Sequence, residues 1–183
     1  MSGRAAVWAY RLLAALPFRA AQGIGAFAGG LAGAWPSRLR RVAETNLELC
    51  MPELDPAARA RLARSSLIET GKAAAESSPL LLRAPERALR LVRAVHGEEV
   101  LEAALAGGRG AILAVPHLGA WEAVGVYCAS RYPMTSMYRP QHRTPALDAL
   151  LRRGRERAGA RLVPSNARGV RALYRGLERG ELV

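Results

Sequence analysis

"AILAVPHLGAWEAVGV", residues 111–126, is the stretch of sequence that decides the fold. Its first five residues are all apolar, and such a short run bounded by turn residues is typical of a buried strand. Residues 121–131 then predict a helix, so the stretch indicates a strand, a turn and a helix. His117 falls just past the end of the strand, and Glu122 follows it by five positions. In parallel sheets ligands bind at the carboxyl ends of the strands, which makes this turn the first candidate site.

The same alternation continues along the second half of the chain and predicts a parallel sheet. Further strands are expected at 89–95, 134–139 and 161–163, and further helices at 98–108, 145–159 and 167–180. Strands that alternate with helices at this spacing favour βαβ crossovers. The final "GELV", 180–183, looks like the opening of another strand, so we expect the chain to be truncated. The predicted fold class is α/β, with N-terminal helices followed by a mainly parallel sheet that is flanked by helices and incomplete.

The first half of the chain reads as helices with clear start signals. Ser37 is placed to cap a helix over 38–51, and Asp55-Pro56 supplies an N-cap and a first-turn proline for a helix over 57–78. Both residue types are preferred at these positions because they satisfy or lack the free N–H groups of a helix start.

An uncharged segment between Arg19 and Arg38 raises the question of a membrane. Its 18 residues would span roughly 27 Å as a helix, slightly less than a hydrocarbon core. Glycines recur every four positions within it, at 25, 29 and 33, and therefore share one helical face. Three interpretations stay open: a weak anchor or membrane hairpin with Trp8 and Trp35 at the interface, a buried helix of a soluble domain, or a cleaved signal peptide. We take 1–36 as an N-terminal membrane-anchor segment and 37–183 as the main domain.

The charge balance points to anionic partners. The 183 residues include 27 basic and 15 acidic ones, a net charge of +12, and every basic residue except Lys72 is arginine. Such a surface favours nucleic acid, acidic lipid, phosphorylated substrates or an acidic carrier protein, unless codon bias explains the arginines. The arginines lack the aromatic interleaving of RNA-binding motifs, so no nucleic-acid partner is expected. No serine-nucleophile elbow, phosphate-binding loop or zinc-protease motif occurs, and no metal ligands gather around His117.

The histidine and the acid of the opening stretch suit general-base chemistry. A carboxylate that accepts from one imidazole nitrogen fixes the tautomer and raises the basicity of the other nitrogen. That nitrogen can take a proton from an attacking hydroxyl, and free N–H groups at the helix start can hold an oxyanion. The competing interpretation is a structural histidine that only bonds its neighbours. His96 and His142 have no acid at a comparable spacing and are taken as structural.

At "VPHLGAWEAVGVY" the sequence resembles the lauroyl/myristoyl acyltransferases of lipid A biosynthesis, in the lysophospholipid acyltransferase superfamily. The histidine, Gly119, Trp121 and Glu122 match the family signature of a histidine, four residues and an acid, whereas Leu118 and Ala120 depart from it. "ETNLELCMPEL", "MYRPQHRTPALDALLRRGRERAGARLVP" and "GVRALYRGLERGELV" resemble further family blocks in the same order. The likeness covers nearly the whole chain, and family members continue beyond it.

The resemblance implies a glycerolipid-acyltransferase-like fold and an enzyme on the cytoplasmic face of the bacterial inner membrane. It would transfer an acyl chain from acyl carrier protein, or acyl-CoA, to a hydroxyl of an anionic lipid A precursor, with no metal or other cofactor. His117 would be the general base and Glu122 its orienting partner. Arg139 and Arg155 match basic positions of the family and would bind phosphate or the carrier's phosphopantetheine. The alternative is a catalytically incompetent, basic membrane-surface protein with the same fold.

Overall fold

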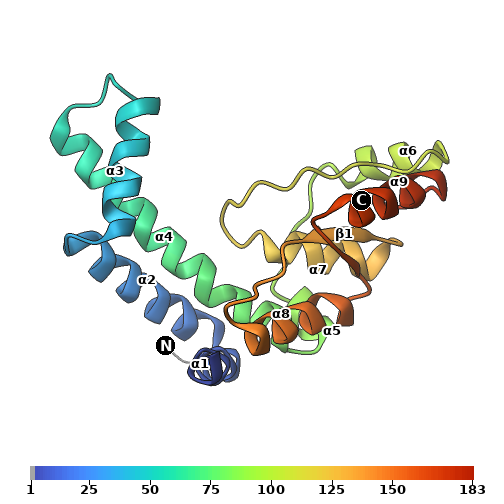
Figure 1. Cartoon of the computed structure of the whole chain (residues 1–183), viewed down its shortest axis with the longest axis horizontal. Coiled ribbons are helices and arrows are strands. Elements are labelled where there is room, and N and C mark those ends of the chain that lie inside the picture. Colours follow the sequence, from blue (N-terminus) through green and yellow to red (C-terminus); the bar gives the residue numbers. More distant parts are fainter. Residues whose placement is uncertain (1–2) are drawn as a thin grey trace.

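The computed structural model describes residues 3–183, which form two groups of elements (Figure 1). The N-terminal group is helical, and the C-terminal group combines short helices with two strands. The helices are α1 Gly3–Ala15, α2 Phe18–Ala34, α3 Arg38–Cys50, α4 Pro56–Leu82, α5 Pro85–Leu89, α6 Glu98–Ala106, α7 Glu122–Arg131, α8 Pro145–Arg157 and α9 Ala167–Glu178. The strands are β1 Thr135–Tyr138 and β2 Arg161–Pro164. The described chain is therefore mostly helical, with a smaller sheet than the sequence predicts.

The expected helix starts at 38 and 56 are confirmed. The Ser37 hydroxyl accepts from the N–H of Arg40 at 3.0 Å, and the Asp55 carboxylate accepts from the N–H of Ala58 at 2.8 Å. Each bond satisfies one of the N–H groups that a helix start leaves without an intrahelical partner. The two caps fix where α3 and α4 begin.

The glycine face of α2 packs directly on α4. A Cβ at Gly25 would lie 2.3 Å from the carbonyl oxygen of Gly71, and one at Gly29 would lie 2.2 Å from that of Leu67. Only a residue without a side chain allows two helix backbones to approach this closely. The three glycines share one helical face, as the sequence predicts, and that face makes a close contact with α4. Across the whole described range, 3–183, no helix is both long and apolar enough to cross a membrane.

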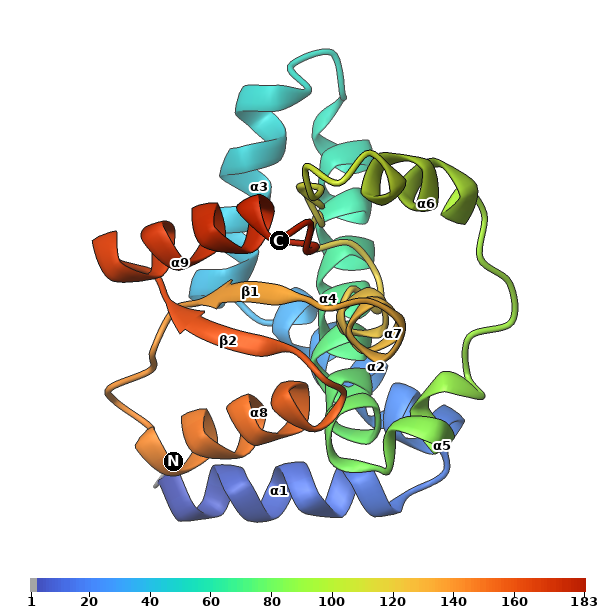
Figure 2. The same ribbon diagram turned by 90° about the vertical axis from the view of Figure 1, so that its right-hand side faces the viewer.

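The two strands are parallel, as predicted, and lie between helices. β1 pairs with β2 with Thr135 opposite Arg161 and Tyr138 opposite Pro164. Figure 2 shows the two strands side by side, with α9 on one side and α8 on the other. The alternation of strands and helices is therefore realised around a short sheet.

The end of the chain extends this sheet by individual bridges. Leu182 forms parallel bridges with both Ala111 and Met134. The N–H of Leu113 donates to the carbonyl of Val183 at 2.8 Å, and the N–H of Val183 donates to that of Ala111 at 2.9 Å. The expected strands at 111–115 and 180–183 thus pair in parallel, but only over a few residues.

The predicted strand at 89–95 is wrong. Pro85 opens the short helix α5, and the residues that follow are irregular up to α6. Val92 and Val95 gave the segment its strand-like composition, but a strand also needs a neighbour for its N–H and C=O groups.

The helix predicted over 57–78 continues to Leu82 because its last turn belongs to the core. Pro79, Leu80 and Leu81 are buried, and the two leucines pack with residues of α5, α7 and the start of β2. Burial of these side chains outweighs the hydrogen bond that Pro79 cannot donate. The far end of α4 is therefore the centre of the C-terminal group.

Candidate active site

His117 lies on an exposed turn that leads into α7. Gly119, two residues later, has a φ of 55°, a left-handed conformation that favours glycine. The imidazole is exposed and packs against Trp121, with the ring centroids 4.3 Å apart and the planes tilted by 41°. The histidine is thus accessible from outside the protein.

Glu122, the first residue of α7, is buried and bound by an arginine. Its Oε2 accepts from Nε of Arg155 at 3.1 Å, and its Oε1 accepts from Nη2 of Arg155 at 2.5 Å. Arg155 comes from α8, and its side chain is 26% exposed against 7% for that of Glu122. Two parallel bonds between a guanidinium and a carboxylate are a strong, directional pairing. The ion pair joins the start of α7 to α8.

Trp121 lies between the histidine and the ion pair. The guanidinium carbon of Arg155 is 5.5 Å from the centroid of the Trp121 ring, whose other contact is the imidazole. Among residues 3–183 no hydrogen bond joins His117 to Glu122, and both carboxylate oxygens of Glu122 accept from Arg155. The structure brings His117, Trp121, Glu122 and Arg155 together as one cluster, with the predicted acid facing an arginine.

Tyr10 of α1 lies close enough to this cluster for the charges of Glu122 and Arg155 to act on it. Figure 2 shows α1 alongside α8, and the Tyr10 hydroxyl lies 2.5 Å from the Ser77 hydroxyl of α4. Burial raises the pKa of Tyr10 to about 12, and the charges of Glu122 and Arg155 both act on it. For Arg155, burial lowers the pKa, but the hydrogen bond and the charge of Glu122 outweigh it and the pKa is raised. The Arg155 guanidinium therefore stays charged over the whole physiological range.

Arg139 is not part of this cluster. It is exposed just after β1 and lines an open depression of about 1010 Å³ with Gln141, His142, Arg143 and the turn 164–166. Arg155 borders a different, small cavity of about 50 Å³ beside Glu122 and Trp121. The two arginines that match basic positions of the resembled family therefore border different depressions of the structure.

An apolar groove is lined in part by His117. It measures about 510 Å³ and is lined mainly by apolar side chains of the 112–117 segment, β1 and α9, with His117 and Trp121 at its edge. Apolar walls with few polar groups are typical of sites for small organic ligands. Within the described part of the chain, no group of three or more histidine, cysteine, aspartate or glutamate side chains could hold a metal ion.

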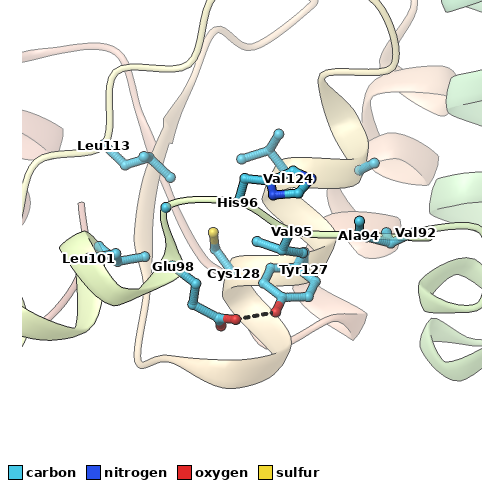
Figure 3. Close-up of a pocket in the computed structure, with 12 residues that line it drawn as sticks. Val92, Ala94, Val95, His96, Glu98, Leu101, Leu113, Val124, Tyr127 and Cys128 are labelled. Atoms are coloured by element: carbon cyan, nitrogen blue, oxygen red, sulfur yellow. Dashed lines mark hydrogen bonds between the residues drawn. The ribbon is translucent and has the colours of Figure 1, made fainter.

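A second apolar pocket, of about 330 Å³, lies between the 92–98 segment and α7 (Figure 3). At its lower end Glu98 accepts from the hydroxyls of Tyr127 and Tyr132, each at 2.8 Å. These bonds lower the pKa of Glu98, and the bond to Glu98 is the main cause that raises the pKa of Tyr132 to about 12. No local pattern in the sequence predicts this cluster, because Tyr127 and Tyr132 lie 29 and 34 positions from Glu98.

Comparison with known proteins identifies the chain's family. Residues 4–183 match the family of bacterial lipid A biosynthesis acyltransferases, and the chain belongs to that family. It is 28% identical over 172 residues to the lipid A biosynthesis acyltransferase of Haemophilus influenzae, covering 93% of this chain and 53% of that protein. It is 26% identical over 168 residues to the lipid A biosynthesis palmitoleoyltransferase of Escherichia coli, covering 92% of this chain and 54% of the relative. The chain thus spans about half the length of the curated relatives it matches.

Proposed function

We propose that this chain contributes the general-base half of an acyltransferase that moves an acyl chain onto a hydroxyl of a lipid A precursor. The observation that carries the proposal is an exposed imidazole at the edge of an apolar groove, with a buried carboxylate at the start of the next helix. Family membership supports the reaction class, and the groove supports an acyl chain or a lipid as the ligand.

In the proposed reaction, His117 takes the proton of the acceptor hydroxyl as that oxygen attacks the acyl carbonyl carbon. The carbon–sulfur bond of the thioester donor breaks, and the leaving thiolate takes the proton back from His117, which regenerates the base. Glu122 orients His117, and we propose that their contact forms when the exposed turn around Gly119 closes over bound substrate. Until then Arg155 holds the carboxylate in place. Catalytic hydrogen bonds are often long or absent in a substrate-free enzyme and form only in the reacting complex. The absence of a hydrogen bond between His117 and Glu122 therefore does not exclude this role.

The charge of the chain supports anionic substrates. Acyl carrier protein and a phosphorylated lipid A precursor would both be attracted by a net charge of +12. Arg139, exposed beside Arg143 and His142, is the proposed phosphate contact, whether on the precursor or on the carrier's phosphopantetheine. We propose the cytoplasmic face of the inner membrane as the place of action, where such a donor and such a lipid meet.

The test is acyl transfer from acyl carrier protein to a lipid A precursor by this chain and its His117→Ala variant. We expect transfer to fall by about 100-fold or more, the usual scale for the loss of a general base. His96→Ala is the matched control, since this exposed histidine lies outside the proposed site. Equal activity of the His117→Ala variant and the unsubstituted chain would overturn the assignment.

A second candidate function is a basic membrane-surface protein without catalytic activity. The observation that favours it is the ion pair itself, which engages Glu122 away from His117. This candidate predicts no transfer by the unsubstituted chain while lipid binding is retained. The same assay, run beside a binding measurement, therefore separates the two functions.

A further inference from the structure

Helix α2 has two faces of opposite character. Its small residues Ala21, Gly25, Gly29 and Gly33 are buried. Its large apolar residues point outward, with 49% of Ile24, 69% of Phe27 and 55% of Leu31 exposed, and with 75% of Trp35 exposed just beyond the helix. Figure 1 shows α2 on the side of α4 that faces away from the C-terminal group. An apolar helix face turned to the outside needs an apolar partner.

The attachment of α2 to α4 limits what that partner can be. The two helices touch along most of α2, from Gly25 on Gly71 to Gly33 on Arg64, and the side-chain amide of Gln22 donates to the buried carboxylate of Glu76 at 2.7 Å. α4 carries charged side chains over the same length, including Arg61, Arg64, Glu69 and Lys72. Moving α2 across a bilayer would take these charges into hydrocarbon, at a cost of several kcal/mol. An interface, rather than a span, fits this pair of helices.

The charges around α2 match an anionic lipid surface. The first acidic residue of the sequence is Glu44, whereas six arginines precede it, at positions 4, 11, 19, 38, 40 and 41. Arg19 lies in the first turn of α2 and Arg38 begins the following helix, and both are exposed. Basic residues near a membrane surface are attracted to anionic headgroups by about 1 kcal/mol each. Trp35, at the C-terminal end of α2, is of the type enriched at membrane interfaces.

We propose that α2 lies flat in the headgroup–acyl boundary of one anionic leaflet, with Ile24, Phe27 and Leu31 inserted. The helix then remains packed on α4, and the flanking arginines contact lipid phosphates. The inserted side chains reach about 5–10 Å into the boundary, as is typical of amphipathic interfacial helices. The proposal concerns the surface of α2 alone and does not depend on catalytic activity.

The first arm of the test is binding to vesicles, with no acyl donor or acceptor present. We expect the Phe27→Ser/Leu31→Ser variant to bind phosphatidylglycerol-containing vesicles about tenfold or more weakly, since two partly buried large side chains are lost. Val100→Ser is the matched control, because Val100 is also 69% exposed but lies on α6. Unchanged far-UV circular dichroism and an unchanged melting temperature in the absence of lipid show that the variants are folded. Equal loss in the control, or equal binding to pure phosphatidylcholine, would overturn the proposal.

The second arm distinguishes a flat helix from a spanning one. Nitroxide labels at Ile24→Cys, Phe27→Cys and Leu31→Cys, in a Cys50→Ser background, report the depth of each position by electron paramagnetic resonance. A flat α2 places all three labels at the same depth. A spanning helix changes depth by about 1.5 Å per residue, or about 10 Å between positions 24 and 31. A depth gradient of that size would overturn the proposal even if the vesicles bind, and it would leave the acyltransferase proposal untouched.

Discussion

Helix α2 packs on the middle of α4 and helix α8 packs on its C-terminal end, both through glycines, yet the outer faces of α2 and α8 are opposite in character. Gly29 of α2 lies against the backbone of α4 at Leu67, and Gly154 of α8 lies against it at Leu81, where an added Cβ would be 2.6 Å from the carbonyl oxygen. The outer face of α8 carries Arg152, Arg153 and Glu156, all exposed. Beyond the exposed Arg19 of its first turn, the outer face of α2 is apolar and uncharged.

This contrast shows that the close approach of the helix backbones determines which residues lie on the inner face of each helix. The residues on the outer face depend on what that face is exposed to. α8 faces water with charges and turns Arg155 inward, where a buried carboxylate meets it. α2 has no charge between Arg19 and Arg38, and its large apolar side chains Ile24, Phe27 and Leu31 are 49–69% exposed. The buried core cluster therefore lies in the C-terminal group and the end of α4, whereas the outer face of α2 turns large apolar side chains to the outside.

The largest expected effect comes from the inward charge of α8. Arg155→Ala leaves the buried carboxylate of Glu122 without its partner, and we expect the free energy of unfolding to fall by about 3–5 kcal/mol. Arg152→Ala is the control on the same helix, since its pair with Glu156, at 3.7 Å, is exposed and is worth about 0.5 kcal/mol or less. Urea denaturation measures both. Similar losses for the two variants would contradict the burial of the Glu122–Arg155 pair.

The next effect compares apolar residues of the two groups directly. Leu81 is 1% exposed, and Leu81→Ala should lower the free energy of unfolding by about 2–5 kcal/mol because it leaves a cavity. Phe27→Ala removes a larger side chain, but an exposed one, and should change stability by about 0.5 kcal/mol or less in the absence of lipid. Thermal and urea unfolding test the pair. A large loss for Phe27→Ala would show that the outer face of α2 is covered by protein.

The glycine contacts give a smaller effect that changes sign along α2. Gly29→Ala forces a Cβ against the Leu67 carbonyl and should cost about 1–3 kcal/mol as the helices move apart. Gly30→Ala has space, since its Cβ would lie 3.8 Å from Ile68, and should stabilise by about 0.5–1 kcal/mol through helix propensity. Melting temperatures that shift in the same direction for both variants would contradict the close approach of α2 to α4.

The smallest effect is a pH dependence at Glu98. The hydrogen bonds from Tyr127 and Tyr132 lower the pKa of Glu98 below its ordinary value of 4.5, so the folded state binds its proton more weakly than the unfolded state does. The resulting stability is present above that ordinary value and is lost as the pH falls through the lowered pKa. Glu98→Gln should remove this part of the acid-side loss, as measured by unfolding at a series of pH values. An unchanged pH profile would contradict the cluster.

Local signals in the sequence were sufficient to predict the elements whose start and type depend on neighbouring residues. The caps at Ser37 and Asp55, the helices α7, α8 and α9, and the parallel pairing of β1 with β2 all follow from residue types and spacing. The prediction of a strand at 89–95 was wrong because its valines favour extended backbone but cannot supply a partner strand. The end of α4 was placed too early because the burial of Pro79, Leu80 and Leu81 depends on α5 and α7, which the local sequence does not report.

For the candidate site, the sequence by itself determined that His117 and Glu122 flank one strand-to-helix turn, because five residues and a glycine leave little freedom. Only the tertiary structure decided which neighbours they meet. Arg155 lies 33 positions from Glu122, and the packing of α8 against α4 brings it there. The same holds for α2, whose glycine spacing predicted one face of small residues without indicating that α4 packs on it. Neighbouring residues determine where a helix or strand begins and ends. The contacts between distant segments depend on which helix faces can approach each other closely.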